Sequence, residues 1–270
     1  MTFGRYLLLH VPPVPLGILT VGVSVAAALG ALLLVRRFIS HERLRLHNDV
    51  AGFLFGTIGV IYAVLLAFTV IVVWENYDEA TANVDKEASC IANIFRNVEQ
   101  LNEPFRSDAL ALMREYVAAT VTYDWETTGR GQISPRMFEL QGRVWKLFGG
   151  YTGRTQPEEV FFELAVEKFN DLCDARRMRL LASRAGVDTI LWCVLIFGGM
   201  ITVVFTFFFG IASLKSQIVM TSLLTALISL ILFTVLAFDY PFTGRLGIPP
   251  EPIRNNLRFF GYPSSQEVQP

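Results

Sequence analysis

The 270-residue sequence has few of the residues that build disulfide frameworks, metal sites or hydrolytic active sites. Its cysteines are Cys90, Cys173 and Cys193. Three cysteines without paired spacing fit neither a disulfide framework nor a zinc site, and we interpret them as small buried hydrophobes. In "HERLRLH", His41, Glu42 and His47 lack the H-E-x-x-H spacing that places two imidazoles on one helical face. We interpret this segment as a basic loop at the lipid headgroups and predict no metal and no cofactor.

Catalytic motifs are also absent from the sequence. It has no G-x-S-x-G, no CxxC and no glycine loop that would cradle a phosphate, and we interpret "GRGQ" at Gly129 as a helix break. Membrane enzymes and proton-coupled transporters usually carry ionisable side chains inside their spans. The cores of the four apolar segments described below contain no Asp, Glu, His, Lys or Arg. We therefore predict no catalytic residue and no enzyme.

Charge is scarce and almost balanced. Charged residues make up 17% of the chain and hydrophobic residues 53%, whereas soluble domains have about 25% charged residues. The net charge of −1 argues against a nucleic acid as a partner. The excess of apolar residues is typical of a protein whose partner is the lipid bilayer.

Four apolar segments are long enough to cross a membrane, which takes about 20 residues. They are residues 14–35, 50–74, 190–212 and 217–238. The first exceeds the length of a signal-peptide core and ends in Arg36 and Arg37 instead of a cleavage site. One short loop joins the first two segments and another joins the last two, which predicts two hairpins. The chain is therefore expected to be an all-α membrane protein.

A helical insert separates the hairpins. Apolar residues recur every three or four positions from Ala80 to Leu101, and no Pro or Gly occurs between Gly59 and Glu103. The second span is therefore expected to continue as one helix of about 50 residues, ~75 Å long. Further helices are predicted with an N-cap at Ser107, with Pro135 at a first position, and over the segment that leads into the third span. The predicted divisions are a first hairpin (1–74), a soluble insert (75–188), a second hairpin (189–240) and a polar tail (241–270).

Basic residues near the membrane give the orientation. Nine lie on the side of the insert and both termini and five on the other side, which favours a cytoplasmic insert and cytoplasmic termini. The short first loop favours the opposite orientation, because it carries four basic residues in fourteen.

The second span carries a stripe of small residues on one helical face: Gly52, Gly56, Gly59, Ala63 and Ala67. One interpretation is close helix packing of the small-xxx-small kind. The other places this helix around the axis of an oligomer. A pore would then be lined by this face or by its neighbour, which carries Phe53, Thr57, Val60 and Val64.

Polar residues flank this span at both ends. Asn48 and Asp49 precede it and are expected either to cap the helix or to form a polar ring at a pore mouth. Glu75, Asp78 and Glu79 follow it, and the arginines from Arg176 to Arg184 and Asp239 are expected at the same membrane level. These charges either pair between adjacent helices or select permeant ions.

Three motifs carry a resemblance to a known family. They are "HNDVAGFLFGTIGVIYAVLLAFTVIVVWENYDEA", "VDKEA" and "FDYPFTGRLGIPPEP". On these residues the chain resembles the bacterial bestrophin-like domain family of four-span membrane proteins, over almost all of residues 36–252. The resemblance implies a bacterial inner membrane, and bestrophins proper imply a pentameric anion channel lined by the second span. Two departures stand out: Gly56 and Gly59 lie where a bulky neck is expected, and Asp239 has no acidic neighbours that would imply calcium gating.

The expected function is a homo-oligomeric channel for small ions, possibly anions. Gly52, Gly56, Thr57, Gly59 and Ala63 are the expected lining or packing residues. The expected mouth residues are Asn48, Asp49, Glu75, Asp78, Arg184 and Asp239. The alternative is a non-conducting membrane scaffold or sensor whose helical insert binds a partner.

Overall fold

The computed structural model describes residues 3–39, 48–153 and 155–260, and these residues form helices joined by short connections, with no strand among them. Four helices are long and apolar enough to cross a membrane, which confirms the predicted all-α membrane fold. The chain divides into two compact units. We call Thr2–Glu75 with Gly186–Asp239 the membrane unit, and Asn76–Ala185 with Tyr240–Pro270 the insert unit.

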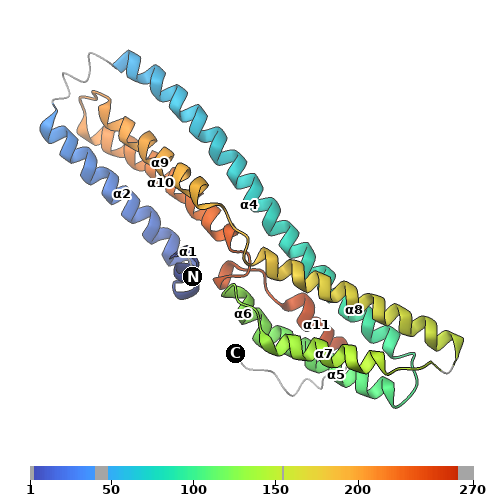
Figure 1. Ribbon diagram of the computed structural model, residues 1–270. Coiled ribbons are helices and arrows are strands. Elements are labelled where there is room, and N and C mark those ends of the chain that lie inside the picture. The colour runs from blue at the N-terminus through green and yellow to red at the C-terminus, as the bar shows by residue number, and fades with distance from the viewer. Residues whose placement is uncertain (1–2, 40–47, 154, 261–270) are drawn as a thin grey trace. The chain divides into compact units, whose positions relative to one another are not determined.

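The membrane unit contains the apolar parts of the four long helices. It contains α1 (Phe3–His10), α2 (Pro13–Phe38), the first half of α4 (Asn48–Val98), α9 (Thr189–Phe205), the short η2 (Thr206–Phe208) and α10 (Leu214–Asp239). α10 packs along α2, and α9 contacts both (Figure 1). The third span ends near Phe208, earlier than the predicted boundary at residue 212, because Phe209 leaves the helical conformation.

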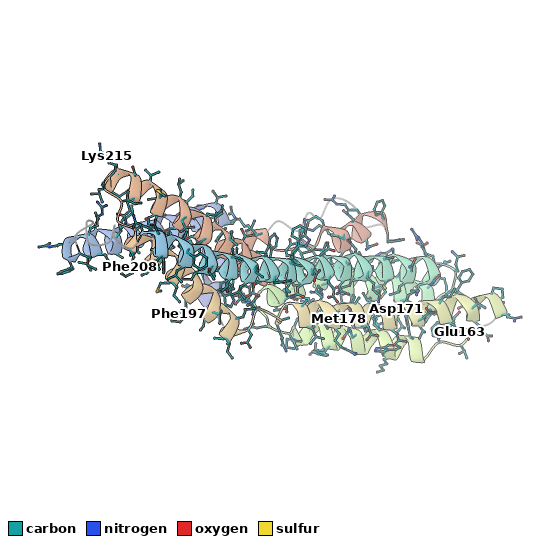
Figure 2. All side chains as sticks on the ribbon, turned by 90° about the horizontal axis from the view of Figure 1, so that it is seen from above. Glu163, Asp171, Met178, Phe197, Phe208 and Lys215 are labelled. Atoms are coloured by element: carbon teal, nitrogen blue, oxygen red, sulfur yellow. The ribbon has the colours of Figure 1, made fainter. Side chains whose placement is uncertain are left out.

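Large apolar side chains cover the outside of the membrane unit. Phe197 is 59% and Phe208 44% exposed in the protomer, and Figure 2 labels both. In water such surfaces mark contact sites, but on helices that cross a bilayer they suit lipid tails.

α4 is a single helix of 51 residues, as the absence of Pro and Gly after Gly59 predicts. Its residues up to Glu75 belong to the membrane unit and those from Asn76 to the insert unit. From Ala80 to Val98 its predicted apolar stripe is buried in the core of the insert unit.

The insert unit is a helical bundle around this second half of α4. It contains α5 (Phe105–Ala119), the π-helical turn η1 (Thr120–Asp124), α6 (Trp125–Gly129), α7 (Pro135–Gly149), α8 (Gln156–Ala182), η3 (Gly244–Leu246) and α11 (Glu251–Phe259). α5 contacts both α7 and α11. α8 begins with a capping box, in which Thr155 and Glu158 satisfy each other's backbone amides.

Two local predictions were wrong. Ser107 does not cap α5, which begins at Phe105, and the Ser107 hydroxyl instead donates to the carbonyl of Pro104. The segment after Pro241 is not merely a polar tail, because Ile248 and Ile253 are buried in the core of the insert unit. Asn256 also donates from Nδ2 to the carbonyl oxygen of Ala88 at 3.0 Å.

Candidate functional site

One side of α4 in the membrane unit is fixed against α9. The Tyr62 hydroxyl donates to the carbonyl oxygen of Leu195 at 2.9 Å. Gly198 and Gly199 form a notch for the Tyr62 ring, since a Cβ on either would lie 2.7 Å from a Tyr62 atom. The close packing of small residues therefore occurs here, at two glycines of α9 that the sequence analysis did not single out.

The predicted small face of α4 is uncovered in the protomer. Among the residues that the structure describes, a Cβ placed on Gly52, Gly56 or Gly59 would meet no atom within 4 Å beyond the helix itself. Ala63 is exposed, and so is Thr57, whose hydroxyl donates to the carbonyl of Phe53 at 3.2 Å. None of these glycines packs against another described residue of the protomer, so their face is free to contact lipid, another copy of the chain or a lumen.

The expected mouth residues occupy different environments. Asp49, Glu75 and Asp78 are exposed. Asn48 is half-buried and accepts a hydrogen bond at Oδ1 from the amide of Gly210 at 2.9 Å, which ties the start of α4 to the turn after η2. Arg184 is exposed in the insert unit and donates from Nε to the carbonyl oxygen of Gly131 at 3.2 Å.

Asp239 differs from the expected mouth charge. Its side chain lies inside the membrane unit, where residue 239 is 5% exposed. Its carboxylate accepts from the amide of Val187 at 2.5 Å and from Nε1 of Trp192 at 3.3 Å. These hydrogen bonds connect the end of α10 to the start of α9, so Asp239 holds the third and fourth spans together.

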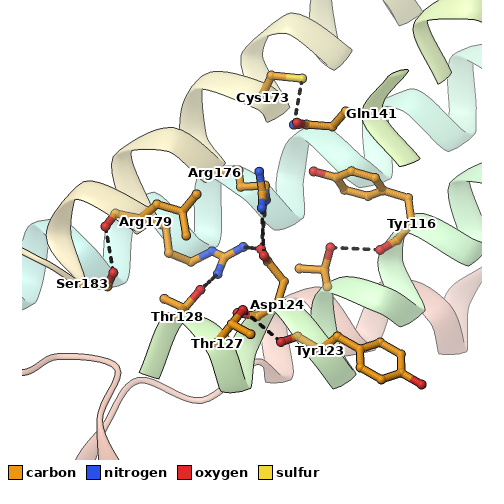
Figure 3. A network of polar contacts seen from close by, with 12 residues as sticks. Tyr116, Tyr123, Asp124, Thr127, Thr128, Gln141, Cys173, Arg176, Arg179 and Ser183 are labelled. Atoms are coloured by element: carbon orange, nitrogen blue, oxygen red, sulfur yellow. Dashed lines mark hydrogen bonds and ion pairs between the residues drawn. The ribbon is translucent and has the colours of Figure 1, made fainter. Parts of the chain in front are cut away.

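A buried polar network lies in the insert unit (Figure 3). Its centre is Arg179, which has no exposed surface. Nε of Arg179 donates to Glu87 at 2.7 Å, Nη2 to Asp124 at 2.7 Å, and Nη1 to Thr128 at 2.8 Å. The guanidinium also lies 4.8 Å from the ring centroid of Trp125. One side chain of α8 thus joins α4, η1 and α6.

Arg176 binds the same carboxylate one turn earlier. Its Nε and Nη2 donate to the two oxygens of Asp124 at 2.9 and 2.8 Å. Burial acts to raise the pKa of Asp124, but the hydrogen bond from Arg176 and the charges of Arg179 and Arg176 outweigh it and hold this pKa below its usual value. The network therefore holds two guanidiniums against the carboxylates of Glu87 and Asp124.

Tyr116 borders this network. Its side chain is fully buried, and its hydroxyl has no hydrogen-bond partner among the residues that the structure describes. Burial and the nearby charge of Glu87 raise its pKa well above the usual value.

The sequence analysis placed Arg176 and Arg179 wrongly. It expected them to pair with the carboxylates after the second span or to select permeant ions, whereas their guanidiniums are buried in the insert unit and bind Asp124 and Glu87. The signal was present in α8, where Ala165, Phe169, Leu172, Arg176 and Arg179 follow one buried stripe at spacings of four, three, four and three. Two arginines that continue an apolar stripe must meet buried acids, because unpaired buried charges are very costly.

The residues that the structure describes contain no cluster of His, Cys, Asp or Glu placed to hold a metal ion. His41, Glu42 and His47 lie outside these residues. Cys90 is buried, Cys173 is half-buried and Cys193 is exposed on α9. The prediction that all three cysteines are buried was therefore wrong for Cys193, which lies on a span that can face lipid.

Known structures share this arrangement of helices. A crystal structure of a bacterial bestrophin homolog from Klebsiella pneumoniae has a TM-score of 0.64 and 17% identity, over 91% of this chain and 99% of the homolog. Two single-substitution variants of that homolog have TM-scores of 0.65 and 0.63 at 16% and 15% identity. They cover 90% and 94% of this chain, and 98% and 100% of their own. At these identities the likeness shows the fold.

No curated protein matched the sequence. The family model of the bestrophin-like domain matches residues 22–253, which is well over half of the chain. This membrane protein therefore belongs to the bestrophin-like domain family.

Proposed function

We propose that the chain is the subunit of a homo-oligomeric channel that passes small ions, possibly anions, with α4 lining the conduit. By analogy with bestrophins the ring has five subunits, lies in a bacterial inner membrane and has its insert units and termini in the cytoplasm. Asp49, Glu75, Asp78 and Arg184, exposed in the protomer, supply charge near the mouths.

The observation that carries this proposal is the uncovered small face of α4. An adjoining side of the helix is fixed on α9 through Tyr62, while a Cβ on Gly52, Gly56 or Gly59 would meet no atom of another described residue within 4 Å. Glycine and alanine offer lipid tails little surface, whereas they let neighbouring helices or a lumen come close to the backbone. In a ring of copies with this face toward the axis, the small residues would let neighbouring helices or the lumen come close to the backbone.

A second candidate is a non-conducting scaffold. The face beside the glycines carries large apolar side chains, with Phe53 76% and Val60 64% exposed and Thr57 as its polar member. A path lined by such residues dewets easily, and a dry seam between two copies would cover the same surface.

Ion flux from liposomes tests the two candidates. We expect wild-type protein to release chloride, and Gly56→Leu to reduce or alter that flux at unchanged subunit number, because a leucine side chain enters the conduit. Gly22→Leu is the matched control, since Gly22 on α2 also has no atom near a Cβ, and its flux should equal that of the wild type.

Liposomes that stay tight to chloride and to potassium at the same protein density would favour the scaffold. In that case Gly56→Leu should weaken association of the copies, measured as mass in detergent by light scattering.

A further inference from the structure

We propose that a cavity between α7 and α8 of the insert unit binds a small organic anion with an apolar body, such as an aromatic carboxylate. The cavity has a volume of about 220 Å³ and lies within one unit of the chain. Its apolar walls include Ile133, Phe138 and Leu180, and its basic residues are Arg176, Arg177 and Arg184.

The cationic part of the cavity comes from α8 and the residues just after it. The three arginines follow one another at spacings of one and seven residues, with Leu180 and Leu181 between them on the same side of the chain. Among the described residues that line the cavity none is acidic. Its charged lining is therefore entirely positive, although Asp124 and Asp174 pair with Arg176 and Arg177 from outside it.

Arg176 is the buried and fixed arginine of the cavity. Its side chain is 3% exposed, and its printed hydrogen bonds to Asp124 use Nε and Nη2. Nη1 keeps its donors for a ligand, since no bond to a described residue uses them. In the view of Figure 3 the guanidinium lies between Asp124 on one side and Cys173 and Gln141, which line the cavity, on the other.

Arg177 and Arg184 are exposed partners at the rim. Arg177 is held loosely, with 3.4 Å from Nη2 to Asp174 and 71% of its side chain exposed. Arg184 uses Nε for the carbonyl of Gly131, which leaves its terminal nitrogens for a second partner. Guanidinium groups in this state bind carboxylates in a bidentate manner.

The rest of the lining selects an apolar, small ligand. Phe138 is 57% exposed, and the Arg176 guanidinium lies 5.7 Å from its ring centroid, so an aromatic ring can contact both. Burial raises the pKa of Cys173 to about 11, so its thiol stays neutral and adds no negative charge. Pockets for drug-sized ligands have volumes of roughly 300–1,000 Å³. A smaller cavity fits a single-ring carboxylate.

The test is ¹⁹F NMR of 4-fluorobenzoate with the full-length protein in detergent. We expect saturable line broadening that benzoate reverses and that benzyl alcohol, which has the same ring without the charge, does not. Arg177→Gln/Arg184→Gln and Phe138→Ala should each weaken binding roughly tenfold or more. Arg106→Gln is the control, because this arginine is exposed on α5 outside the cavity and its loss should leave binding unchanged.

The three variants change exposed side chains, and unchanged thermal unfolding would show that each is folded. Absence of saturable binding to the folded wild type would overturn the proposal. So would equal displacement by benzyl alcohol, or equal binding in Arg177→Gln/Arg184→Gln and wild type. None of these outcomes depends on whether the protein conducts ions.

Discussion

At the scale of single residues, the insert unit depends on a small set of buried charges. Arg179 and Glu87 have no exposed side-chain surface, and Asp124 lies between Arg179 and Arg176. Removing such ions from water costs more than one pair returns, so the arrangement is stable only while every member keeps its partners.

Replacing Arg179 by methionine should destabilise the insert unit by about 3–5 kcal/mol, because Glu87 and Asp124 then lose charge partners in a buried place. Denaturant unfolding of the purified protein measures this loss. Arg143→Met is the matched control, since Arg143 pairs with Glu115 at the surface, where such pairs contribute little. Equal unfolding of the two variants would contradict the structural role of Arg179.

The lowered pKa of Asp124 predicts how stability depends on pH. A carboxylate with a depressed pKa in the folded state stabilises fully above its unfolded pKa, about 3.9, and the gain is lost as pH falls through the folded value. Unfolding midpoints should therefore fall below about pH 4. Asp124→Asn should start lower and show a smaller fall. A fall of the same size in Asp124→Asn would assign the acid sensitivity to other groups.

At the scale of elements, the contact between α4 and α9 is steric. A Cβ on Gly199 would lie 2.7 Å from the Tyr62 hydroxyl oxygen, whereas a Cβ on Gly198 would lie 2.7 Å from a ring carbon of Tyr62. The two glycines thus meet different atoms of the same side chain.

Gly199→Ala should destabilise the membrane unit by about 1–3 kcal/mol because of overpacking. Tyr62→Phe should partly rescue Gly199→Ala by removing the hydroxyl oxygen, but it should not rescue Gly198→Ala. Thermal unfolding in detergent measures Gly199→Ala and Gly198→Ala, each with and without Tyr62→Phe. Gly22→Ala is the control, because a Cβ at Gly22 meets no described atom within 4 Å. Rescue of both alanines to the same degree would contradict the proposed contacts.

The sequence predicted the elements better than their contacts. Uninterrupted apolar runs define the four spans and α4, because length and composition suffice for a membrane helix. α11 was missed, since Ile253 and Leu257 form only a short apolar stripe among polar neighbours and pack against residues far away in the chain. The partners of Arg179 were missed for the same reason: Glu87 and Asp124 lie 92 and 55 positions away.

At the scale of the whole molecule, the orientation in the membrane is a prediction from nine basic residues against five. A fluorescent protein that folds only in the cytoplasm, fused after Pro270, should be bright, and alkaline phosphatase at the same place should be inactive. Active phosphatase with a dark fluorescent fusion would place the insert unit outside and reverse the proposed mouths.

The core of the insert unit is closed by the segment that follows α10. Ile248 and Ile253 complete it, and the Thr243 hydroxyl donates to the carbonyl of Gly129 at 2.8 Å. During synthesis these residues leave the ribosome after both hairpins, although α4 to α8 emerge long before. The core of the insert unit therefore stays incomplete until the second hairpin has been made. Its folding requires that the second hairpin and the segment after it have been translated.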